Sequence, residues 1–430
     1  MRYHQVVTSF LTDAEEILLL RRGGKVGSHR GKWSAVSGYL EGTEQPLTRA
    51  VTEIHEELGL SAHQIKLVRI GETLRAYDEE NDTVWIVHPF LFEALSKSIK
   101  LDWENVDYRW VAPSRLPSYP TVPKLRETLD RVRYDLQSVP ASLTPLVSKV
   151  KQLGEDRVHG ATFIGRQAVG FLSEAAQVSD ARDTDTLFSH LLLIGLRLRR
   201  VQPAMANVWN LTGKLLQAVD QHRANGASLE VLRSSTSKKS AQILEESAQA
   251  SEDVSRNTVR ILPQDGVVLT HSYSSTVLRS LELGFKGERN FKVYATESHP
   301  GMEGKELAKE LIRSQISVTL IADSAVNSIL QEIDLVLVGG DSVLRDGSLV
   351  HKVGTRDIST AAKEYGVPVY GACECIKFSA QDFLGERPEN SPLFDLTPPE
   401  FMSGYITEEG ELAPACVEDR IRSLQKEIYP

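Results

Sequence analysis

Residues 38–60 read GYLEGTEQPLTRAVTEIHEELGL, and this stretch decides the fold of the first part of the chain. Three of its carboxylates, Glu53, Glu56 and Glu57, are spaced i, i+3 and i+4, so on a helix they lie on one face. Like charges at that spacing cost about 0.2–0.5 kcal/mol per pair in an isolated helix. A hard divalent cation reverses this cost, because Mg²⁺ prefers carboxylate oxygens together with substrate phosphate and water. An ordinary acidic helix would explain the three glutamates alone, so the spacing of the whole stretch carries the prediction of a metal site.

The stretch resembles the Nudix box, a pattern of glycine, glutamate and aliphatic residues at fixed spacing. The matching positions are Gly38, Glu44, Glu53, Ile54, Glu56, Glu57, Gly59 and Leu60. One position departs from the box, which has an arginine where this chain has Thr52. In the family that arginine orients a neighbouring carboxylate.

The resemblance implies an α/β/α sandwich over residues 1–138 and hydrolysis of a nucleoside diphosphate linked to another moiety. It implies Mg²⁺ as cofactor, with Mn²⁺ as the alternative, held by Glu53, Glu56 and Glu57. The same glutamates are the expected catalytic residues, together with Glu44, which would support the metal shell or act as a base. Gly38 is expected to contact the substrate.

A loop with five cationic side chains and four glycines precedes the box, over residues 21–32. Glycines let a backbone approach a polyphosphate closely, and cations neutralise it. We therefore expect Arg21, Arg22, Arg30 and Lys32 to bind the substrate phosphates. The alternative is a solvated surface loop, which is the usual setting of such charge clusters.

Length and composition bound the rest of the interpretation. A chain of 430 residues predicts two or three domains, and its 41% hydrophobic and 25% charged residues are typical of globular proteins. The sequence has no run of 18 apolar residues, which predicts no membrane span, and its N-terminus reads as a strand rather than a signal peptide. Three cysteines fit a reducing compartment, so we expect a cytoplasmic protein. A net charge of −9 gives no general reason to bind nucleic acid.

The order of expected elements suggests three domains, with boundaries at 1–138, 139–255 and 256–430. The first contains strands at 3–10, 15–21, 33–37, 66–77, 82–92 and 107–111, a turn at 79–82 and a helix at 124–136. Residues 143–251 have helical periodicity throughout. From residue 260 onward, short apolar strands alternate with helices, which indicates a buried parallel sheet.

Polar residues follow the strands of this sheet, at the edge where such sheets bind ligands. They lie in pieces such as LTHSYS at 269–274, ESHP at 297–300 and GGDSV at 339–343. With further pieces up to residue 399, they resemble the initiation factor 2B alpha, beta and delta subunits. Isomerases of methylthioribose 1-phosphate and ribose 1,5-bisphosphate belong to the same family. The resemblance implies a helical subdomain, a Rossmann-like subdomain, oligomerisation and a second ligand site with these residues: His271, Ser272, Glu297, His299, Asp341 and Lys352.

Two positions separate this chain from the isomerases. In those enzymes a cysteine and an aspartate move protons at the sugar carbons; Asp341 matches the aspartate, but Ser272 stands at the cysteine. An arginine that binds phosphate is replaced by His299, while Lys352 remains available for phosphate. Cys373 and Cys375 lack the further ligands of a zinc site and are expected to be buried, unreactive thiols.

Three hypotheses follow. The first is a Mg²⁺-dependent Nudix hydrolase fused to a module that binds a sugar phosphate or nucleotide and forms a homo-oligomer. The second is a non-catalytic protein that senses small phosphorylated ligands, or an assembly or translation-initiation-factor-like protein. The third is a sugar-phosphate isomerase acting through Asp341 and Ser272.

Overall fold

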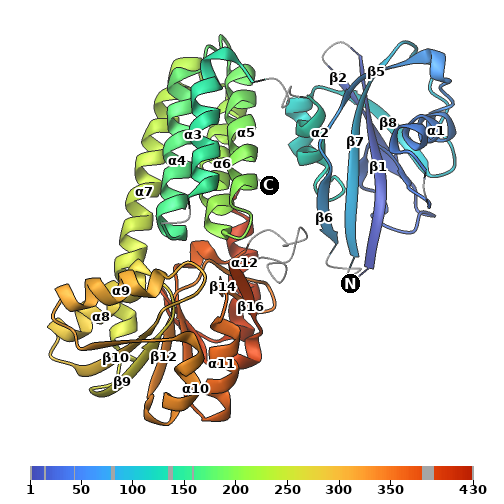
Figure 1. Ribbon diagram of the computed structural model, residues 1–430. Helices are drawn as coiled ribbons and strands as arrows, with labels where there is room; N and C mark the ends of the chain where they lie inside the picture. Colours follow the sequence, from blue (N-terminus) through green and yellow to red (C-terminus); the bar gives the residue numbers. More distant parts are fainter. Residues whose placement is uncertain are drawn as a thin grey trace. The chain divides into compact units, whose positions relative to one another are not determined.

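The computed structural model describes residues 2–13, 16–42, 44–78, 83–133, 139–156, 159–379 and 392–428. The chain divides into two compact units, residues 1–138 and residues 139–429, which are described separately (Figure 1). The expected turn at 79–82 and the expected end of a helix at 134–136 lie outside the described residues. None of the described helices has the length and apolar character needed to span a membrane.

The first unit is built on one mixed sheet of eight strands. Its strands are β1 (Arg2–Asp13), β2 (Glu16–Arg22), β3 (Trp33–Ser34), β4 (Val36–Tyr39), β5 (Ile65–Ile70), β6 (Leu74–Asp78), β7 (Thr83–Ala94) and β8 (Asn105–Val111). The central strand β1 runs parallel to β7 and antiparallel to β2 and β4. Because β1 and β7 are long and adjacent, they form the centre of the sheet, and the other elements of the unit pack around them.

Two helices cover different faces of this sheet. Residues of β1 alternate between the faces, as the period of two in a strand requires. Val7 and Leu11 belong to the core under α1 (Pro46–Leu58), and Phe10 belongs to the core under α2 (Leu125–Arg133). The face toward α1 therefore positions the acidic helix.

The second unit begins with five helices that pack side by side (Figure 1). They are α3 (Thr144–Glu155), α4 (Ala161–Val178), α5 (Thr184–Val201), α6 (Ala206–Ala224) and α7 (Leu229–Val259). With 31 residues, α7 is long enough to run from the bundle to the following sheet, where it contacts α8 (Ser275–Lys286). The bundle and the sheet are therefore joined by a continuous helix.

The sheet of the second unit has seven strands in the order β11-β10-β9-β12-β15-β17-β18, and all neighbours except β17 and β18 are parallel. The strands are β9 (Asp265–Thr270), β10 (Asn290–Thr296), β11 (Val318–Ile321), β12 (Leu335–Val338), β15 (Val369–Ala372), β17 (Gly404–Thr407) and β18 (Gly410–Leu412). Helices cover both faces, so the central strand β12, with the sequence LVLV, is apolar and buried at every position.

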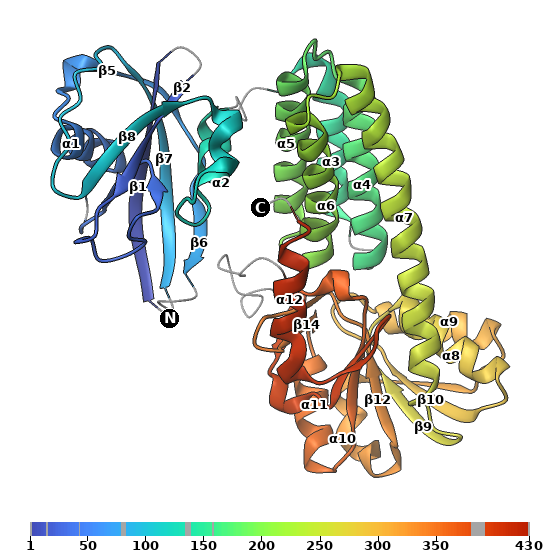
Figure 2. The same ribbon diagram turned by 180° about the vertical axis from the view of Figure 1, so that it is seen from behind.

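Alternate residues of β12 show the two faces. Val336 and Val338 pack under α10 (Val326–Ile329), α11 (Thr355–Glu364) and α12 (Val417–Gln425), the last seen best in Figure 2. Leu335 and Leu337 pack on the opposite face, under α7, α8 and α9 (Glu303–Arg313). The α/β class that the sequence predicts is confirmed.

The sequence did not predict the pairing of several short strands near the C-terminus. An antiparallel sheet of three strands contains β13 (Ser342–Val343), β14 (Leu349–Lys352) and β16 (Phe394–Thr397). The strands β17 and β18 were also missed. Each of these has two to four residues, too few to show a period of two, and β16 pairs with a strand some forty positions earlier.

Candidate functional site

The acidic stretch forms α1, as its local signals require. Pro46 occupies the start of the helix, where its missing N–H costs nothing. Gly59 ends the helix with φ of 68°, a left-handed conformation that glycine adopts without strain, and its N–H bonds to His55 O. The residues that anchor the helix to the sheet are spaced four apart: Ala50, Ile54 and Leu58. Their burial sets the rotation of the helix.

That rotation also buries two glutamates of α1. Glu57 is 6% exposed and is held from two sides. The Ser37 N–H donates to its Oε1 at 2.9 Å, and Asn105 Nδ2 donates to its Oε2 at 2.7 Å. Burial raises the pKa of Glu57 to about 8, although both hydrogen bonds act in the opposite direction. The carboxyl group is thus fixed in position and gains from a nearby positive charge.

Glu53 approaches the sheet so closely that β4 must carry a glycine beside it. A Cβ added to Gly38 would lie 1.5 Å from Glu53 Oε1. Burial raises the pKa of Glu53, and the charge of Glu56 adds to the effect, while Arg49 opposes it. Gly38, expected to contact substrate, therefore makes room for a carboxylate at the wall of the site.

Arg49 is the residue of this site that the sequence interpretation missed. Its guanidinium contacts the carboxylate of Glu53 and lies 3.4 Å from Glu56 Oε2. Thr52, at the position of the box arginine, instead donates its hydroxyl to Thr48 O at 3.1 Å. The available signal was the spacing, since Arg49 precedes Glu53 by four residues, which places the two side chains together on a helix.

The charges around Arg49 include Glu44. Burial lowers the pKa of the guanidinium, but the charge and hydrogen bond of Glu53 outweigh it. Glu44 adds a smaller contribution of the same sign, so its carboxylate is near enough to act on Arg49 through charge. Glu44 is not among the residues that line the cavity described next.

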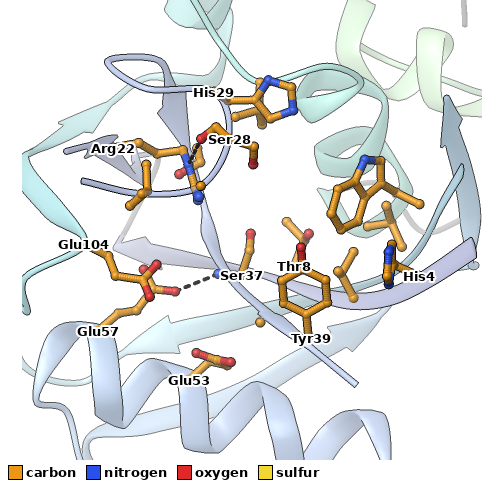
Figure 3. Close-up of a pocket in the computed structure, with 18 of the residues that line it drawn as sticks. His4, Thr8, Arg22, Ser28, His29, Ser37, Tyr39, Glu53, Glu57 and Glu104 are labelled. Atoms are coloured by element: carbon orange, nitrogen blue, oxygen red, sulfur yellow. Dashed lines mark hydrogen bonds between the residues drawn. The ribbon is translucent and has the colours of Figure 1, made fainter. Parts of the chain in front are cut away.

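These side chains meet in a cavity of about 900 Å³ within the first unit (Figure 3). The expected site residues that line it are Arg22, Gly38, Glu53, Glu56 and Glu57. Glu41, Asp102 and Glu104 add three more carboxylates. Figure 3 shows Glu57 and Glu104 on one side of the cavity and His4 and Tyr39 on the other.

The glycine-rich loop reaches this cavity with only one of its four expected phosphate ligands. Arg22 lines the cavity, and its Nε donates to Ser28 O at 3.2 Å. Arg30 donates its Nε to Val26 O at 2.9 Å and is not a lining residue. Arg21 and Lys32 are not lining residues either.

The donor set suits a hard cation, because carboxylate oxygens are the side-chain ligands that Mg²⁺ prefers. Three of the lining carboxylates, Glu53, Glu56 and Glu57, come from one helix, and burial raises the pKa of Glu53 and Glu57, although Arg49 opposes the shift at Glu53. In the part of the chain that the structure describes, no three His, Cys, Asp or Glu side chains converge as ready metal ligands. Mg²⁺ commonly uses one or two carboxylates and completes its shell with water and substrate phosphate.

The second unit contains a buried polar network where β9 and β10 end. His271 Nδ1 lies 2.6 Å from Thr296 Oγ1, and its Nε2 lies 2.9 Å from Val353 O. The Ser272 N–H donates to Ser298 Oγ at 2.6 Å. Both serines have left-handed backbones, with φ of 65° and 61°. Strained residues persist only where the surroundings enforce them, and they cluster at functional sites.

Asp341 and Lys352 belong to the same region. Asp341 is 8% exposed, and burial raises its pKa, while Lys377 and Lys352 act in the opposite direction. Lys352 Nζ lies 2.7 Å from Glu303 Oε1. Two carboxylates and two ammonium groups therefore share a largely dry site.

The remaining predicted residues of the second site lie nearer the surface. Glu297 pairs with Lys305 at 3.2 Å, and the side chain of His299 is 60% exposed, 3.3 Å from Asp323. A cavity of about 540 Å³ at this edge is lined by His271 and ten other residues, which do not include the other five predicted ones.

Both cysteines of the β15 region are buried, as expected. Burial raises the pKa of Cys375 to about 12 and the pKa of Cys373 further still. Thiolates are the reactive form of cysteine, so neither thiol is reactive at neutral pH.

Comparison with known proteins relates each unit to a family. Residues 2–132 match the NUDIX domain, and residues 157–389 match the initiation factor 2 subunit family. The chain is 31% identical over 278 residues to a translation initiation factor eIF-2B subunit 2-like protein of Pyrococcus abyssi, covering 62% of this chain and 95% of that protein. It is 26% identical over 310 residues to a ribose 1,5-bisphosphate isomerase of Haloterrigena turkmenica, covering 65% and 93%.

Solved structures have the fold of the second unit. The Pyrococcus horikoshii OT3 translation initiation factor eIF-2B is 26% identical with a TM-score of 0.55, covering 64% of this chain and 98% of that chain. The tetrameric eIF2B-beta2-delta2 complex from C. thermophilum is 23% identical with a TM-score of 0.58, covering 66% and 95%. The chain therefore belongs to the initiation factor 2 subunit family and carries a NUDIX domain ahead of the region that defines it.

Proposed function

We propose that the first unit is a Mg²⁺-dependent hydrolase that cleaves a nucleoside diphosphate linked to another moiety. One observation carries the proposal: Glu53 and Glu57 are buried in the wall of a cavity that Glu56 and Arg22 also line. Buried carboxylates beside a cation-bearing loop suit a ligand that brings both a metal and phosphates. The match to the NUDIX domain supports a hydrolase of this class.

Each residue has a separate role in this proposal. Glu53, Glu56 and Glu57 would hold Mg²⁺, or Mn²⁺ in its place, and Glu44 would balance the charge of Arg49. The bound ion would neutralise the diphosphate and lower the pKa of a water molecule. Arg22 would pair with a phosphate.

Neighbouring side chains and backbone groups hold the carboxylates of this site in fixed positions. Ser37 and Asn105 hold both oxygens of Glu57, and Arg49 holds Glu53. Preorganised charges act without reorganisation during the reaction, which is the usual source of electrostatic catalysis.

The test is a substrate panel with Mg²⁺ that contains ADP-ribose, nucleotide sugars, dinucleoside polyphosphates and nucleoside triphosphates. We expect turnover of at least one diphosphate-linked nucleotide, and loss of both turnover and Mg²⁺ affinity when Glu56→Gln and Glu57→Gln are combined. Glu16→Gln, an exposed glutamate of β2, is the matched control. No turnover by the unaltered chain, with unchanged Mg²⁺ affinity in the double variant, would overturn the proposal.

A second proposal concerns residues 139–430, which we infer to bind a small phosphorylated ligand, a sugar phosphate or nucleotide. The observation that favours it is Asp341, a carboxylate that is only 8% exposed and whose pKa burial raises against the charges of Lys377 and Lys352. Buried polar groups normally have partners, so a ligand hydroxyl is a fitting one. Lys352 would pair with phosphate, and His271, Ser272, Glu297 and His299 would border the ligand.

Binding without conversion is the outcome we expect at this second site. A serine hydroxyl is a far weaker acid than a thiol, whose pKa is about 8.5, so Ser272 is a poor substitute for the cysteine of the isomerases. This supports a sensing or assembly role over the isomerase alternative. We further propose a homo-oligomer formed through the second unit.

Calorimetry with ribose 1,5-bisphosphate and nucleotides, together with light scattering, tests both points. Binding with no isomerisation in a coupled assay, by a dimer or larger species, is expected. Isomerisation of ribose 1,5-bisphosphate by the unaltered chain would revive the isomerase hypothesis. A monomer that binds no phosphorylated ligand would exclude the sensing role.

A further inference from the structure

Residues 100–105, an irregular segment that leads into β8, are tied to the C-terminal end of α1. The Lys100 N–H donates to Leu58 O at 2.9 Å. The Asp102 N–H donates to Glu57 O at 3.2 Å. The last carbonyls of a helix have no partner within the helix, so these two bonds fix the segment to the helix end. The segment is therefore held beside Glu57.

Asn105, at the end of this segment, reaches the carboxylate of Glu57. Its side chain is 6% exposed and does not line the cavity. Its Nδ2 donates to Glu57 Oε2 at 2.7 Å and lies 3.4 Å from Asp102 Oδ1. An amide nitrogen has two hydrogens, so one can point to each carboxylate. Asn105 therefore stands between two carboxylates and donates to both.

Asp102 decides which end of the Asn105 amide faces Glu57. An asparagine side chain that turns by half a rotation exchanges its nitrogen for its oxygen. The amide oxygen would then face Glu57 Oε2 and Asp102 Oδ1, which are both acceptors. Buried acceptors without a donor are unfavourable. Two carboxylates therefore favour the donating orientation more strongly than Glu57 does alone.

Asp102 is itself held by the backbone of the segment. Its Oδ1 also accepts a hydrogen bond from the Glu104 N–H at 3.0 Å. A rotation that moved Oδ1 away from Asn105 would break this bond as well. The support therefore runs from Asp102 to Asn105, and from Asn105 to Glu57.

The same segment holds the start of the glycine-rich loop. The Gly23 N–H donates to Glu104 O at 2.7 Å, and Arg22 is the partner of Asn105 across the pair of β2 and β8. A Cβ added to Gly23 would lie 3.0 Å from Glu104 O, so the loop approaches the segment at a residue without a side chain. One segment outside the acidic helix thus positions both Arg22 and Glu57.

We propose that Asp102 and Asn105 are positioning residues of the first unit: Asp102 fixes the amide of Asn105, and the amide fixes Glu57 for Mg²⁺. The inference rests on the proposed hydrolase function, because Glu57 is a metal ligand only within that proposal. Asp102 also lines the cavity, where a carboxylate could instead serve as a metal ligand or a base. Those two roles need its negative charge, whereas positioning needs only an acceptor oxygen.

Two substitutions of Asp102 separate the oxygen from the charge. Asp102→Asn keeps an oxygen that accepts from Asn105 and from the Glu104 N–H but removes the charge, and Asp102→Ala removes both. Mg²⁺ alone is titrated into each full-length protein by calorimetry, and kcat and KM are measured at saturating Mg²⁺ with a substrate from the panel. Asp102→Ala should weaken Mg²⁺ binding by about 10-fold, the lower end of the range for residues that orient metal ligands. It should also lower kcat more than it raises KM, and Asp102→Asn should retain all three quantities.

A double-mutant cycle tests whether Asp102 acts through Asn105. Asn105→Leu keeps the approximate size of the side chain and removes the donor, so Mg²⁺ binding should weaken by about 10- to 100-fold. Adding Asp102→Ala to Asn105→Leu should cause little further loss, because the amide that Asp102 orients is absent. Additive losses, or equal losses in Asp102→Asn and Asp102→Ala, would overturn the inference. The two Asp102 variants decide the question even where Asn105→Leu does not fold.

Asp107→Ala is the matched control. Asp107 lies two residues after Asn105 on β8 and does not line the cavity. Its Oδ1 accepts from the Tyr108 N–H at 2.9 Å, so the substitution removes a local hydrogen bond of the same kind that Asp102 makes with Glu104. Mg²⁺ affinity, kcat and KM should stay unchanged. A loss equal to that of Asp102→Ala would overturn the inference, because it would assign the effect to a general disturbance of β8.

The two proposals fail in different ways. If the unaltered chain cleaves diphosphates but the Asp102 variants match it in Mg²⁺ affinity and kcat, the positioning role is wrong and the hydrolase stands. If the unaltered chain cleaves nothing in the panel but the variants differ in Mg²⁺ affinity as expected, the hydrolase is wrong and the positioning role stands. A chain that neither binds Mg²⁺ nor cleaves any substrate would overturn both.

Discussion

The guanidinium of Arg49 lies 3.4 Å from Glu56 Oε2, across two turns of α1, and it also contacts Glu53 between them. An arginine at Thr52 would reach Glu56 from four residues away, the usual spacing for a helical ion pair. Arg49 lies one turn before Thr52 and contacts the same carboxylate. The charge that the box arginine supplies is therefore present in this chain at a different position.

The first prediction concerns this replacement. Arg49→Ala should lower kcat and Mg²⁺ affinity by about 10- to 100-fold, the range found when a residue that orients metal ligands is removed. Adding Thr52→Arg to Arg49→Ala should recover most of the loss, because the new guanidinium lies four residues before Glu56. Turnover of a substrate from the panel and calorimetry with Mg²⁺ measure the two effects.

Thr52→Arg alone is the control for this prediction and should change either quantity less than Arg49→Ala does. An Arg49→Ala variant with unaltered kcat and Mg²⁺ affinity would show that Glu53 and Glu56 need no arginine.

The second prediction separates the position of Glu53 from the stability of the fold. In Gly38→Ala the new Cβ would meet Glu53 Oε1 at 1.5 Å, so the carboxylate must leave the wall of the cavity. A displacement of about 1 Å in a catalytic group can cost about 100-fold in rate, and we expect a loss of that order in kcat. The unfolding temperature should change little, since a glutamate side chain can rotate away.

Gly27→Ala is a close control, because Gly27 lines the same cavity and an added Cβ meets no atom within 4 Å. Its kcat should match that of the unaltered chain. If both alanine variants were equally active, the close approach of Gly38 and Glu53 would have no catalytic role.

The local sequence pattern predicted the acidic helix well. It could not predict contacts that depend on pairing between strands distant in sequence. The start and end of α1 follow from Pro46 and Gly59, and its buried face follows from apolar residues four apart. The contact between the rings of His4 and Trp85 could not be predicted this way, because the two residues become neighbours only through the register of β1 and β7. Nothing within a few residues of either ring indicates its partner.

The glycine-rich loop shows a second limit. Composition marks residues 21–32 as cationic, but the backbone path decides which side chains enter the cavity. Arg22 does so, and Arg30 instead donates to Val26 O within the loop. Arg49 shows the opposite case, a site residue that the sequence indicates but the interpretation missed. Its i, i+4 spacing to Glu53 was visible in the sequence, but the box pattern directs attention to Thr52.

The third prediction tests the phosphate site of the second unit. Lys352→Met should weaken binding of ribose 1,5-bisphosphate by about 10- to 100-fold, because a hydrogen bond to a charged group contributes about 1.5–3 kcal/mol. Lys363→Met is a matched control. Both lysines lie 5.1 Å from the centroid of a phenylalanine ring, Phe394 for Lys352 and Phe401 for Lys363. Calorimetry that finds equal affinities in the two variants would exclude Lys352 from the site.

The fourth prediction uses the buried ion pair between Glu374 and Lys377, whose charged atoms lie 3.0 Å apart. Glu374 is 1% exposed, and its carboxylate also accepts hydrogen bonds from Thr162 of α4 and Ser251 of α7. The pair therefore links two helices of the bundle to the end of β15. Breaking a buried pair costs about 3–5 kcal/mol, because the remaining charge is left without a partner. We expect Glu374→Gln to lower the free energy of unfolding by that amount at pH 7.

The pH dependence gives the prediction its specific form. Burial would raise the pKa of Glu374, but Lys377 and the hydrogen bonds outweigh it and lower the pKa from the ordinary glutamate value of 4.5 to about 2. A depressed pKa in the folded state stabilises the protein above the unfolded pKa, and this contribution is lost as the pH falls toward 2. The difference in unfolding free energy between the unaltered chain and Glu374→Gln should therefore be constant from about pH 6 upward and should shrink below about pH 4.5.

Guanidinium unfolding at a series of pH values measures this difference, and subtraction removes the carboxylates that both proteins share. Glu245→Gln, an exposed glutamate of α7, should show no such dependence. Adding Lys377→Met to Glu374→Gln should restore stability, because it removes the unpaired charge. A difference that stays constant down to about pH 3 would mean that Glu374 titrates in the folded protein as it does in the unfolded chain, and that Lys377 does not hold it ionised.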